Sequence, residues 1–208
     1  MGDITLYIKV FITLLMLVNP LEGMPVFLSA TSSADPQLRR RILKITSISV
    51  VAILLLSIIL GKLILQLFGI STEAFQIGGG AILFLIAVKM TLGPSGFSME
   101  DITGKQIGPE FAIVPLATPL LAGPGAINGA ILFGTRAHNA FEITLLMSIV
   151  VFIGIILYII LRAGHTIASY IGKTGIDVAT RITGLLIAAI AAEMILKGIS
   201  SVFNLKII

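Results

Sequence analysis

The chain has 208 residues, of which 57% are hydrophobic and 12% are charged, and its formal net charge is +4. A soluble domain of this length needs far more polar surface, so the composition excludes an ordinary soluble protein and indicates one compact membrane domain over residues 1–208. The basic residues lie between apolar runs, so the positive-inside rule explains them without a nucleic-acid partner. The sequence has no cysteine, which excludes disulfides, thiolate catalysis and cysteine-based metal sites.

Six apolar runs follow one another along the chain, and each is long enough for a helix that crosses about 30 Å of hydrocarbon. The runs lack the alternating pattern of an outer-membrane barrel, so we expect an all-α polytopic membrane protein with six transmembrane helices. The first run follows Asp3 rather than a basic region, so we interpret it as a membrane segment and not as a cleaved signal peptide. The runs lie at residues 4–30, 45–68, 74–92, 111–133, 142–162 and 180–200.

Two sequence matches indicate an internal duplication. Residues 19–25 (Asn-Pro-Leu-Glu-Gly-Met-Pro) can be laid on residues 118–124 (Thr-Pro-Leu-Leu-Ala-Gly-Pro), with both prolines matching at an offset of 99. A second match, at an offset of 105, pairs residues 76–79 with residues 181–184. The matches occur in the same order, in the first and last apolar run of each half, so they suggest a three-plus-three repeat.

The two repeats are predicted at residues 1–92 and 111–208, with a polar cytoplasmic linker at 93–110. Three spans per half is an odd number, so the second half enters the membrane from the opposite side and the repeat is inverted. Inverted repeats with interrupted helices at matching positions are typical of secondary transporters.

The matched prolines should break the first and fourth helices near mid-depth, because proline removes a backbone hydrogen bond and clashes with the preceding turn. Asn19 is expected to cap a helix that starts at Pro20, and Thr118 with Pro119 is expected to repeat that arrangement. Freed backbone groups must be buried in protein or line a wet cavity. Helix N-terminal amides suit an anion and unwound carbonyls suit a cation, so two facing breaks would suit a zwitterion. The alternative is a pair of structural kinks without a ligand.

These breaks define a predicted substrate site near the midplane of the membrane. Within it, Glu22 is expected to contact a substrate ammonium or to carry a coupling proton. The alternative is that Glu22 forms a variant capping box with Asn19. Asn128 either lines the cavity or makes an interhelical hydrogen bond. The predicted site comprises Asn19, Pro20, Glu22, Gly23, Pro25, Thr118, Pro119, Gly123, Pro124, Gly125 and Asn128.

Other chemistry finds little support in the sequence. His138 and His165 show no metal-ligand spacing, so we expect no metal site. There is no complete Gly-x-x-x-x-Gly-Lys-Ser/Thr phosphate loop and no nucleophile–base arrangement, so we expect neither direct use of ATP, nor another cofactor, nor an enzyme. Glu193 lies within the last apolar run, where it either pairs with a basic group or reaches the outer interface, and a structural role is favoured. The small residues at 78–80 and 184–192 are interpreted as helix-packing faces, with sliding during transport as the alternative.

Three motifs together resemble the MarC family over nearly the whole chain: residues 19–27 (Asn-Pro-x-x-Gly-x-Pro-x-Phe), 114–125 (Val-Pro-Leu-Ala-x-Pro-x-x-Ala-Gly-Pro-Gly) and 180–186 (Thr-Arg-Ile-x-Gly-Leu-Leu). The resemblance implies a bacterial or archaeal inner-membrane protein. It also implies transport of glycine, alanine and related neutral amino acids, coupled to an ion gradient, as in some members. This chain departs from the family pattern at Glu22, where glycine is usual.

The expected function is therefore secondary transport of a small neutral amino acid by alternating access, with a proton or sodium ion as the coupling ion. A channel-like or drug-efflux pore, whose breaks only gate, is the alternative. An intramembrane enzyme is disfavoured because catalytic groups are lacking. The sequence leaves the direction of transport and the oligomeric state open.

The distribution of basic residues predicts the topology. Loops 1, 3 and 5 carry nine of the 14 Lys and Arg residues and the opposite side carries five, so both termini are expected in the periplasm and residues 39–44 in the cytoplasm. Reporter fusions after residue 208 and near residue 100 should report periplasmic and cytoplasmic locations, respectively. A cytoplasmic signal at the C-terminus would contradict either the six-span count or the orientation.

Overall fold

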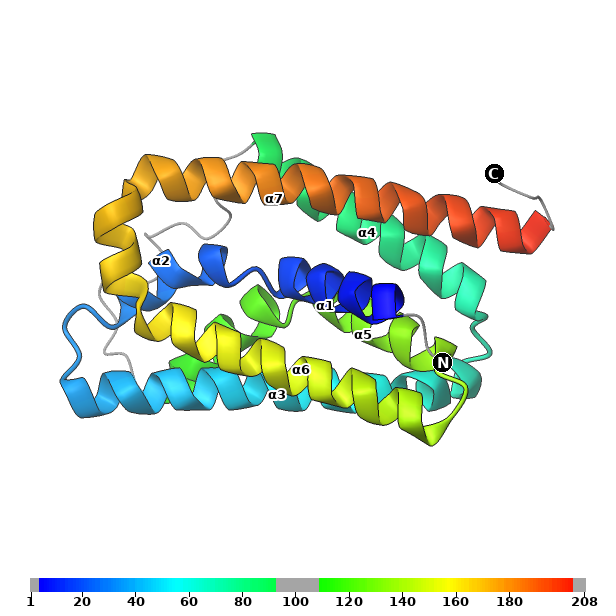
Figure 1. Cartoon of the computed structure of the whole chain (residues 1–208), viewed down its shortest axis with the longest axis horizontal. Helices are drawn as coiled ribbons and strands as arrows, with labels where there is room; N and C mark the ends of the chain where they lie inside the picture. Colours follow the sequence, from blue (N-terminus) through cyan, green and yellow to red (C-terminus); the bar gives the residue numbers. More distant parts are fainter. Residues whose placement is uncertain (1–3, 93–108, 204–208) are drawn as a thin grey trace.

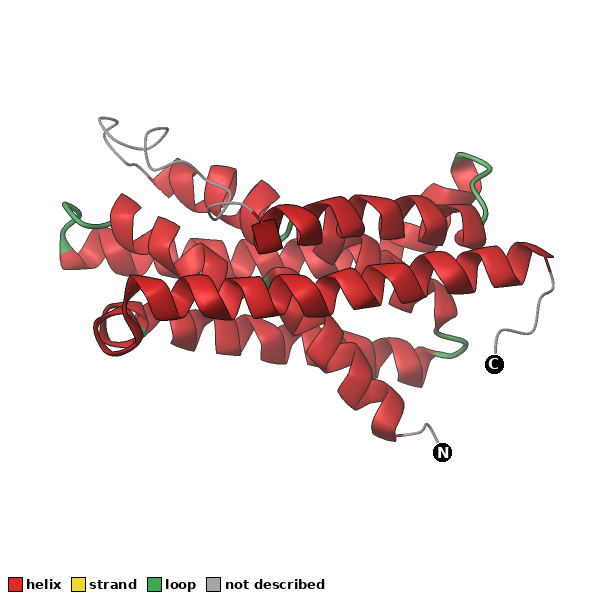
Figure 2. Ribbon diagram, turned by 90° about the horizontal axis from the view of Figure 1, so that it is seen from above, coloured by secondary structure: helices red, strands yellow, loops and turns green. Residues whose placement is uncertain are grey.

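The computed structural model describes residues 4–92 and 109–203, apart from the side chain of Lys173. Every regular element in these ranges is a helix, and the long helices run along one axis of the molecule (Figures 1 and 2). Residues 93–108 of the predicted linker lie outside the described residues. The elements are α1 (Ile4–Val18), α2 (Pro20–Ala30), α3 (Pro36–Leu67), α4 (Thr72–Leu92), the 3-10 turn η2 (Pro109–Ala112), the π-helical segment η3 (Ile113–Leu121), α5 (Pro124–Arg136), α6 (Ala140–Arg162) and α7 (Gly164–Phe203).

The helices confirm an all-α polytopic membrane protein. Five described segments are long and apolar enough to cross a membrane, with α1 and α2 together counted as one span. A sixth span is present if the pair Pro109–Leu121 and Pro124–Arg136, bent by 67°, is one crossing. The predicted count of six therefore depends on a broken helix, at the place where the sequence predicts the second break.

Helix α3 begins nine residues before the apolar run that predicts it. Asp35 caps its first turn, because the Leu38 N–H donates to Asp35 Oδ1 at 2.7 Å, and Pro36 occupies the first helical position. The basic cluster at residues 39–44 therefore lies on the helix, whereas the sequence suggested a loop. With 32 residues the helix is about 48 Å long, so its basic turns extend beyond a hydrocarbon core of about 30 Å.

Helix α7 is bent at Gly172, whose positive φ of 69° suits glycine. The first part of α7 turns away from the long part in Figure 1, and the membrane-crossing part runs from Thr174 to Phe203. The polar stretch 162–181 is thus helical on both sides of this bend, whereas the sequence suggested a connection up to residue 180.

The buried side chains form two clusters. The larger one joins mainly α1, α2, α3, η3, α5 and α6, and the smaller one joins α4, α7 and Leu132 of α5. Helices α4 and α7 pack along each other, with Gly80 close to the Ala191 backbone and Gly184 close to Ala87 (Figure 1). The small residues there allow the close approach that packs membrane helices without a hydrophobic driving force.

Gln76 connects these two groups of helices. It is a buried residue of α4, and its Nε2 donates to the Met194 carbonyl of α7 at 3.0 Å. Its Oε1 accepts a hydrogen bond from Arg136 Nη2 at the end of α5, at 2.8 Å. Both halves of the Gln76 amide are therefore paired, as a buried polar side chain in an apolar surrounding requires.

Candidate functional site

The first break is a single residue, Asn19, between α1 and α2. Its backbone is left-handed (φ 44°, ψ 68°), a conformation that asparagine tolerates better than other residues with a side chain. The Asn19 N–H still donates to the Leu15 carbonyl at 3.0 Å, so α1 keeps its last bond. Pro20 then starts α2 without an N–H that would need an acceptor.

The side chain of Asn19 does not cap α2 in the expected way. Its oxygen accepts no capping bond, and its Nδ2 instead donates to Glu22 Oε2 at 2.8 Å. A capping box would require Glu22 to accept from the Asn19 backbone N–H, which is already bonded within α1. Asn19 therefore occupies the predicted cap position, but the two hydrogen bonds of a capping box are absent, so that interpretation is wrong. Asn19 is buried and Glu22 is partly buried, so this pair lies inside the protein.

The second break differs from the expected register. Thr118 is extended (φ −134°, ψ 125°) and Pro119 lies within the π-helical segment η3, so this pair does not start a helix. The helix that follows, α5, begins at Pro124 after Gly123, whose backbone is extended. The prediction of Thr118 as cap and Pro119 as first helical residue is wrong by five positions. A wide π turn, closed by Ala122 N–H bonding to the Ala117 carbonyl at 2.7 Å, accommodates Pro119 instead.

Proline stands at the first helical position after both breaks. Pro124 lies 104 positions after Pro20, close to the offset of 105 that relates the last spans. At each break a residue in the N-cap position, Asn19 or Gly123, precedes the proline that begins the next helix.

The two breaks lie against each other inside the larger cluster. A Cβ atom on Gly23 would lie 2.6 Å from Leu121 Cδ2, and one on Gly125 would lie 2.6 Å from Leu83 Cδ2. These glycines are therefore covered by leucine side chains in this conformation. A Cβ on Gly123 would lie 2.6 Å from the Pro119 carbonyl oxygen, so a side chain there would disturb the backbone of the break itself.

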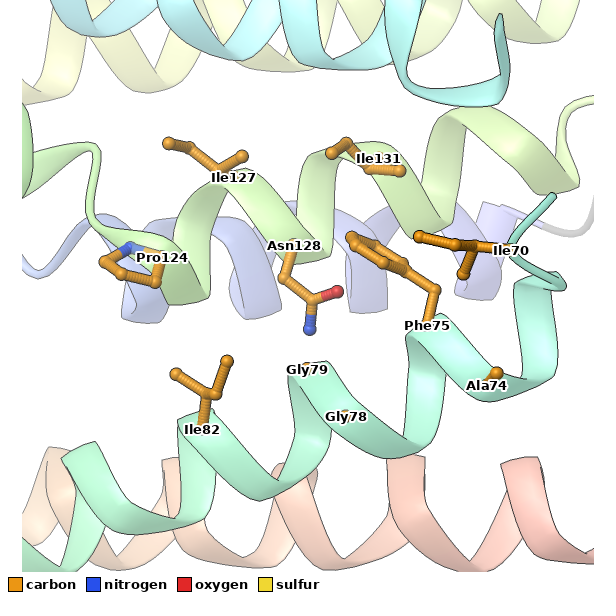
Figure 3. Close-up of a pocket in the computed structure, with 10 residues that line it drawn as sticks. All are labelled: Ile70, Ala74, Phe75, Gly78, Gly79, Ile82, Pro124, Ile127, Asn128 and Ile131. Atoms are coloured by element: carbon orange, nitrogen blue, oxygen red, sulfur yellow. The ribbon is translucent and has the colours of Figure 1, made fainter. Parts of the chain in front are cut away.

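A pocket of about 460 Å³ lies next to the second break, between α4 and α5 (Figure 3). Of the predicted site residues, Pro124 and Asn128 line it, and the others lie elsewhere in and around the two breaks. The contribution of α4 was not predicted from the sequence, where the glycines at 78–80 were interpreted as a packing face or a sliding face. The lining consists of Ile70, Ala74, Phe75, Gly78, Gly79, Ile82, Pro124, Ile127, Asn128 and Ile131.

Asn128 projects from α5 towards Gly79 of α4 in this pocket (Figure 3). It is only 5% exposed, and neither Nδ2 nor Oδ1 has a hydrogen-bond partner among the described residues. A Cβ on Gly79 would overlap the amide, so only glycine there leaves room for Asn128. Thr118 Oγ1, at the second break, is likewise buried and unpaired within the described part of the chain.

Glu193, the other acidic residue considered from the sequence, has a different environment. Glu193 of α7 pairs with Lys197 one turn later, and both side chains are more than half exposed. The structural interpretation of Glu193 agrees with this pair. In the described residues no group of three His, Asp or Glu side chains could hold a metal ion. The polar groups at the breaks are hydrogen-bond donors and acceptors, which suit binding of a small polar molecule.

Comparison with known proteins identifies the family. The family described as "MarC family integral membrane protein" matches residues 4–203. The chain belongs to the MarC family. The UPF0056 membrane protein YhcE of Escherichia coli K12 is 39% identical, and the match covers 97% of this chain and 95% of that protein. A UPF0056 membrane protein of Pyrococcus abyssi is 35% identical over 94% of each chain. No solved structure matches this chain significantly.

The left-handed backbone of Asn19 predicts an order of stabilities for this MarC-family chain. Asn19→Gly and Asn19→Ala both lose the bond to Glu22, but only alanine is strained at positive φ. We expect the alanine variant to be less stable than the glycine variant by about 1 kcal/mol. Thermal unfolding of both purified variants in the same detergent measures this difference. Equal unfolding temperatures would show that backbone strain at residue 19 does not matter.

Proposed function

We propose that this chain is a secondary transporter of small neutral amino acids, similar to glycine or alanine, that works by alternating access. The observation that carries the proposal is the pair of broken helices packed against each other, with Gly23 of α2 touching Leu121 of η3. Discontinuous helices that meet inside a membrane protein are the usual framework of substrate and ion sites in secondary transporters.

The pattern of helix contacts supports an inverted three-plus-three repeat as part of this proposal. In that scheme α3 corresponds to α6, α4 corresponds to α7, and α1 with α2 corresponds to η3 with α5. Helix α3 packs on α6, α4 packs on α7, and the two broken helices pack on each other. Contacts between equivalent elements are expected when a pseudo-two-fold axis passes through the molecule.

The chemistry of the breaks suits a zwitterion. The helix N-termini at Pro20 and Pro124 present amides that favour a carboxylate. Glu22, which accepts a hydrogen bond from the uncharged amide of Asn19, provides a carboxylate for an ammonium group or a coupling proton. The unpaired hydroxyl of Thr118 adds a donor and an acceptor at the second break.

The two side-chain clusters supply units that can move relative to each other. Helices α4 and α7 share one cluster, and most of the remaining helices share the other. In our proposal the α4–α7 pair rocks against the rest and exposes the breaks to each side of the membrane in turn. The pocket between α4 and α5 lies at the boundary between these units.

The proposal includes the setting of the protein. The partners are a small neutral amino acid, a coupling proton or sodium ion and the lipid bilayer, without nucleic acid or cofactor. The chain acts as a transporter and not as an enzyme. It lies in the inner membrane with both termini in the periplasm.

Counterflow in liposomes tests the transport proposal directly. Proteoliposomes loaded with unlabelled alanine should accumulate labelled alanine transiently, and the initial rate should saturate with external alanine. Protein-free liposomes prepared in parallel provide the control for leakage. A flux that rises linearly with concentration and shows no counterflow would indicate a pore, and no flux of glycine or alanine would contradict the substrate class.

Substitution of Glu22 tests its role in coupling. Glu22→Gln keeps an oxygen that can accept from Asn19 Nδ2 but cannot carry a titrating proton. We expect uptake driven by a pH gradient to be lost while alanine counterflow remains. Glu193→Gln, at an exposed ion pair on α7, is the matched control and should leave both measurements unchanged. Normal pH-driven uptake in a folded Glu22→Gln variant would exclude Glu22 as the proton carrier and favour sodium.

A further inference from the structure

The amide of Asn128 is a buried polar group without a partner in an apolar pocket. Its residue is 95% buried, and neither its donor nor its acceptor is paired within the described residues. Burying a polar group without a hydrogen bond costs free energy, so such groups in proteins usually have a partner. Gln76, another buried amide of the described residues, has both of its polar atoms paired, in contrast to Asn128.

The pocket around Asn128 has the composition of a site for a small ligand. Its walls are mostly branched and aromatic side chains of α4 and α5, including Phe75, Ile82, Ile127 and Ile131 (Figure 3). Ligand sites generally combine such walls with a few convergent polar groups and span about 300–1,000 Å³. The volume of about 460 Å³ lies within that range and is larger than glycine or alanine requires.

One end of the pocket adjoins the second break. Pro124 lines the pocket and is the first residue of α5, and Asn128 follows one helical turn later. The first amides of a helix have no intrahelical acceptor. The polar end of a ligand can therefore lie between these amides and Asn128, with its apolar part towards Ile131.

We propose that this pocket is the side-chain subsite for a branched aliphatic amino acid, and that Asn128 binds its α-amino and α-carboxylate groups. Gly79 of α4 covers both atoms in this conformation, so a ligand reaches them only when α4 moves away from α5. Nδ2 would then donate to the carboxylate and Oδ1 would accept from the ammonium, so both unpaired atoms gain a partner. No lining residue is charged, so amino acids with charged side chains are excluded. The transport of such a substrate rests on the function proposed above, whereas its binding does not.

This assignment distinguishes an amino acid from a lipid chain. An acyl chain would fill the apolar walls but would leave both polar atoms of Asn128 unpaired. Only a ligand that carries a donor and an acceptor next to an aliphatic body satisfies the walls and the amide together.

Thermal stabilisation of the purified protein in detergent by leucine is the first measurement. Two analogues each remove one polar group of leucine: 4-methylpentanoate lacks the ammonium and 3-methylbutylamine lacks the carboxylate. Leucine should stabilise the wild type, and each analogue should need a concentration at least about tenfold higher for the same shift. Equal stabilisation by leucine and by 4-methylpentanoate would overturn the assignment, because it would indicate an apolar groove. Absence of any stabilisation by leucine would also overturn it.

Three variants connect the binding to the pocket. Asn128→Ala should abolish stabilisation by leucine, while the unfolding temperature without ligand stays the same or rises, because no hydrogen bond is lost. Gly78→Val adds bulk at a lining position where a Cβ meets nothing within 4 Å. This variant should reduce the thermal stabilisation by leucine more than the stabilisation by alanine. Ala81→Val, at an exposed position of α4 outside the lining, is the matched control. Full stabilisation by leucine in Asn128→Ala would place the ligand elsewhere.

Counterflow separates this inference from the transport proposal. Leucine binding that needs Asn128, without counterflow of any amino acid, would retain the subsite and refute transport. Alanine counterflow without leucine binding would retain transport and refute the subsite.

Discussion

The structure depends on the need to satisfy backbone polar groups where helices break in a membrane. Lipid offers no hydrogen bonds, so an interrupted helix is stable only where protein covers it. At the first break Asn19 keeps its bond to Leu15, and Pro20 removes the next donor. Before the second break, Thr46 of α3 donates to the Ala112 carbonyl at the end of η2, and α2 lies against η3. The two breaks cover each other where Gly23 of α2 lies against Leu121 of η3, and Leu83 of α4 covers Gly125.

The same constraint gathers polar side chains along the contact between the breaks. Asn19 and Glu22 bond to each other there, and the Thr118 hydroxyl and the Asn128 amide are buried at or just after the second break. Elsewhere in the described spans the polar side chains mostly return to their own helix, as Ser57 does with the Ile53 carbonyl. Groups that could bind a solute are therefore concentrated in one region of a chain that is otherwise suited to lipid contact.

The arrangement of helices is the basis for the movement of the α4–α7 pair proposed above. The α4–α7 pair is joined to the remaining helices through few polar contacts, of which Gln76 with Arg136 is the clearest. Side chains pack densely within each cluster, while a pocket remains between α4 and α5. The proposed movement of the α4–α7 pair would open this boundary, and Leu132 of α5 would then leave its contacts in the smaller cluster.

The sequence alone determined the helical spans, because lipid as a solvent requires long apolar runs, and it determined where helices break, because proline and glycine act locally. Only the tertiary structure decided which cap–proline pair starts α5, since Thr118-Pro119 and Gly123-Pro124 are equivalent locally and packing of η3 selects the second. It also decided that residues 162–181 are helical around the bend at Gly172. The pocket at Asn128 depends on Gly79, a residue 49 positions earlier, so no local pattern could have predicted that contact.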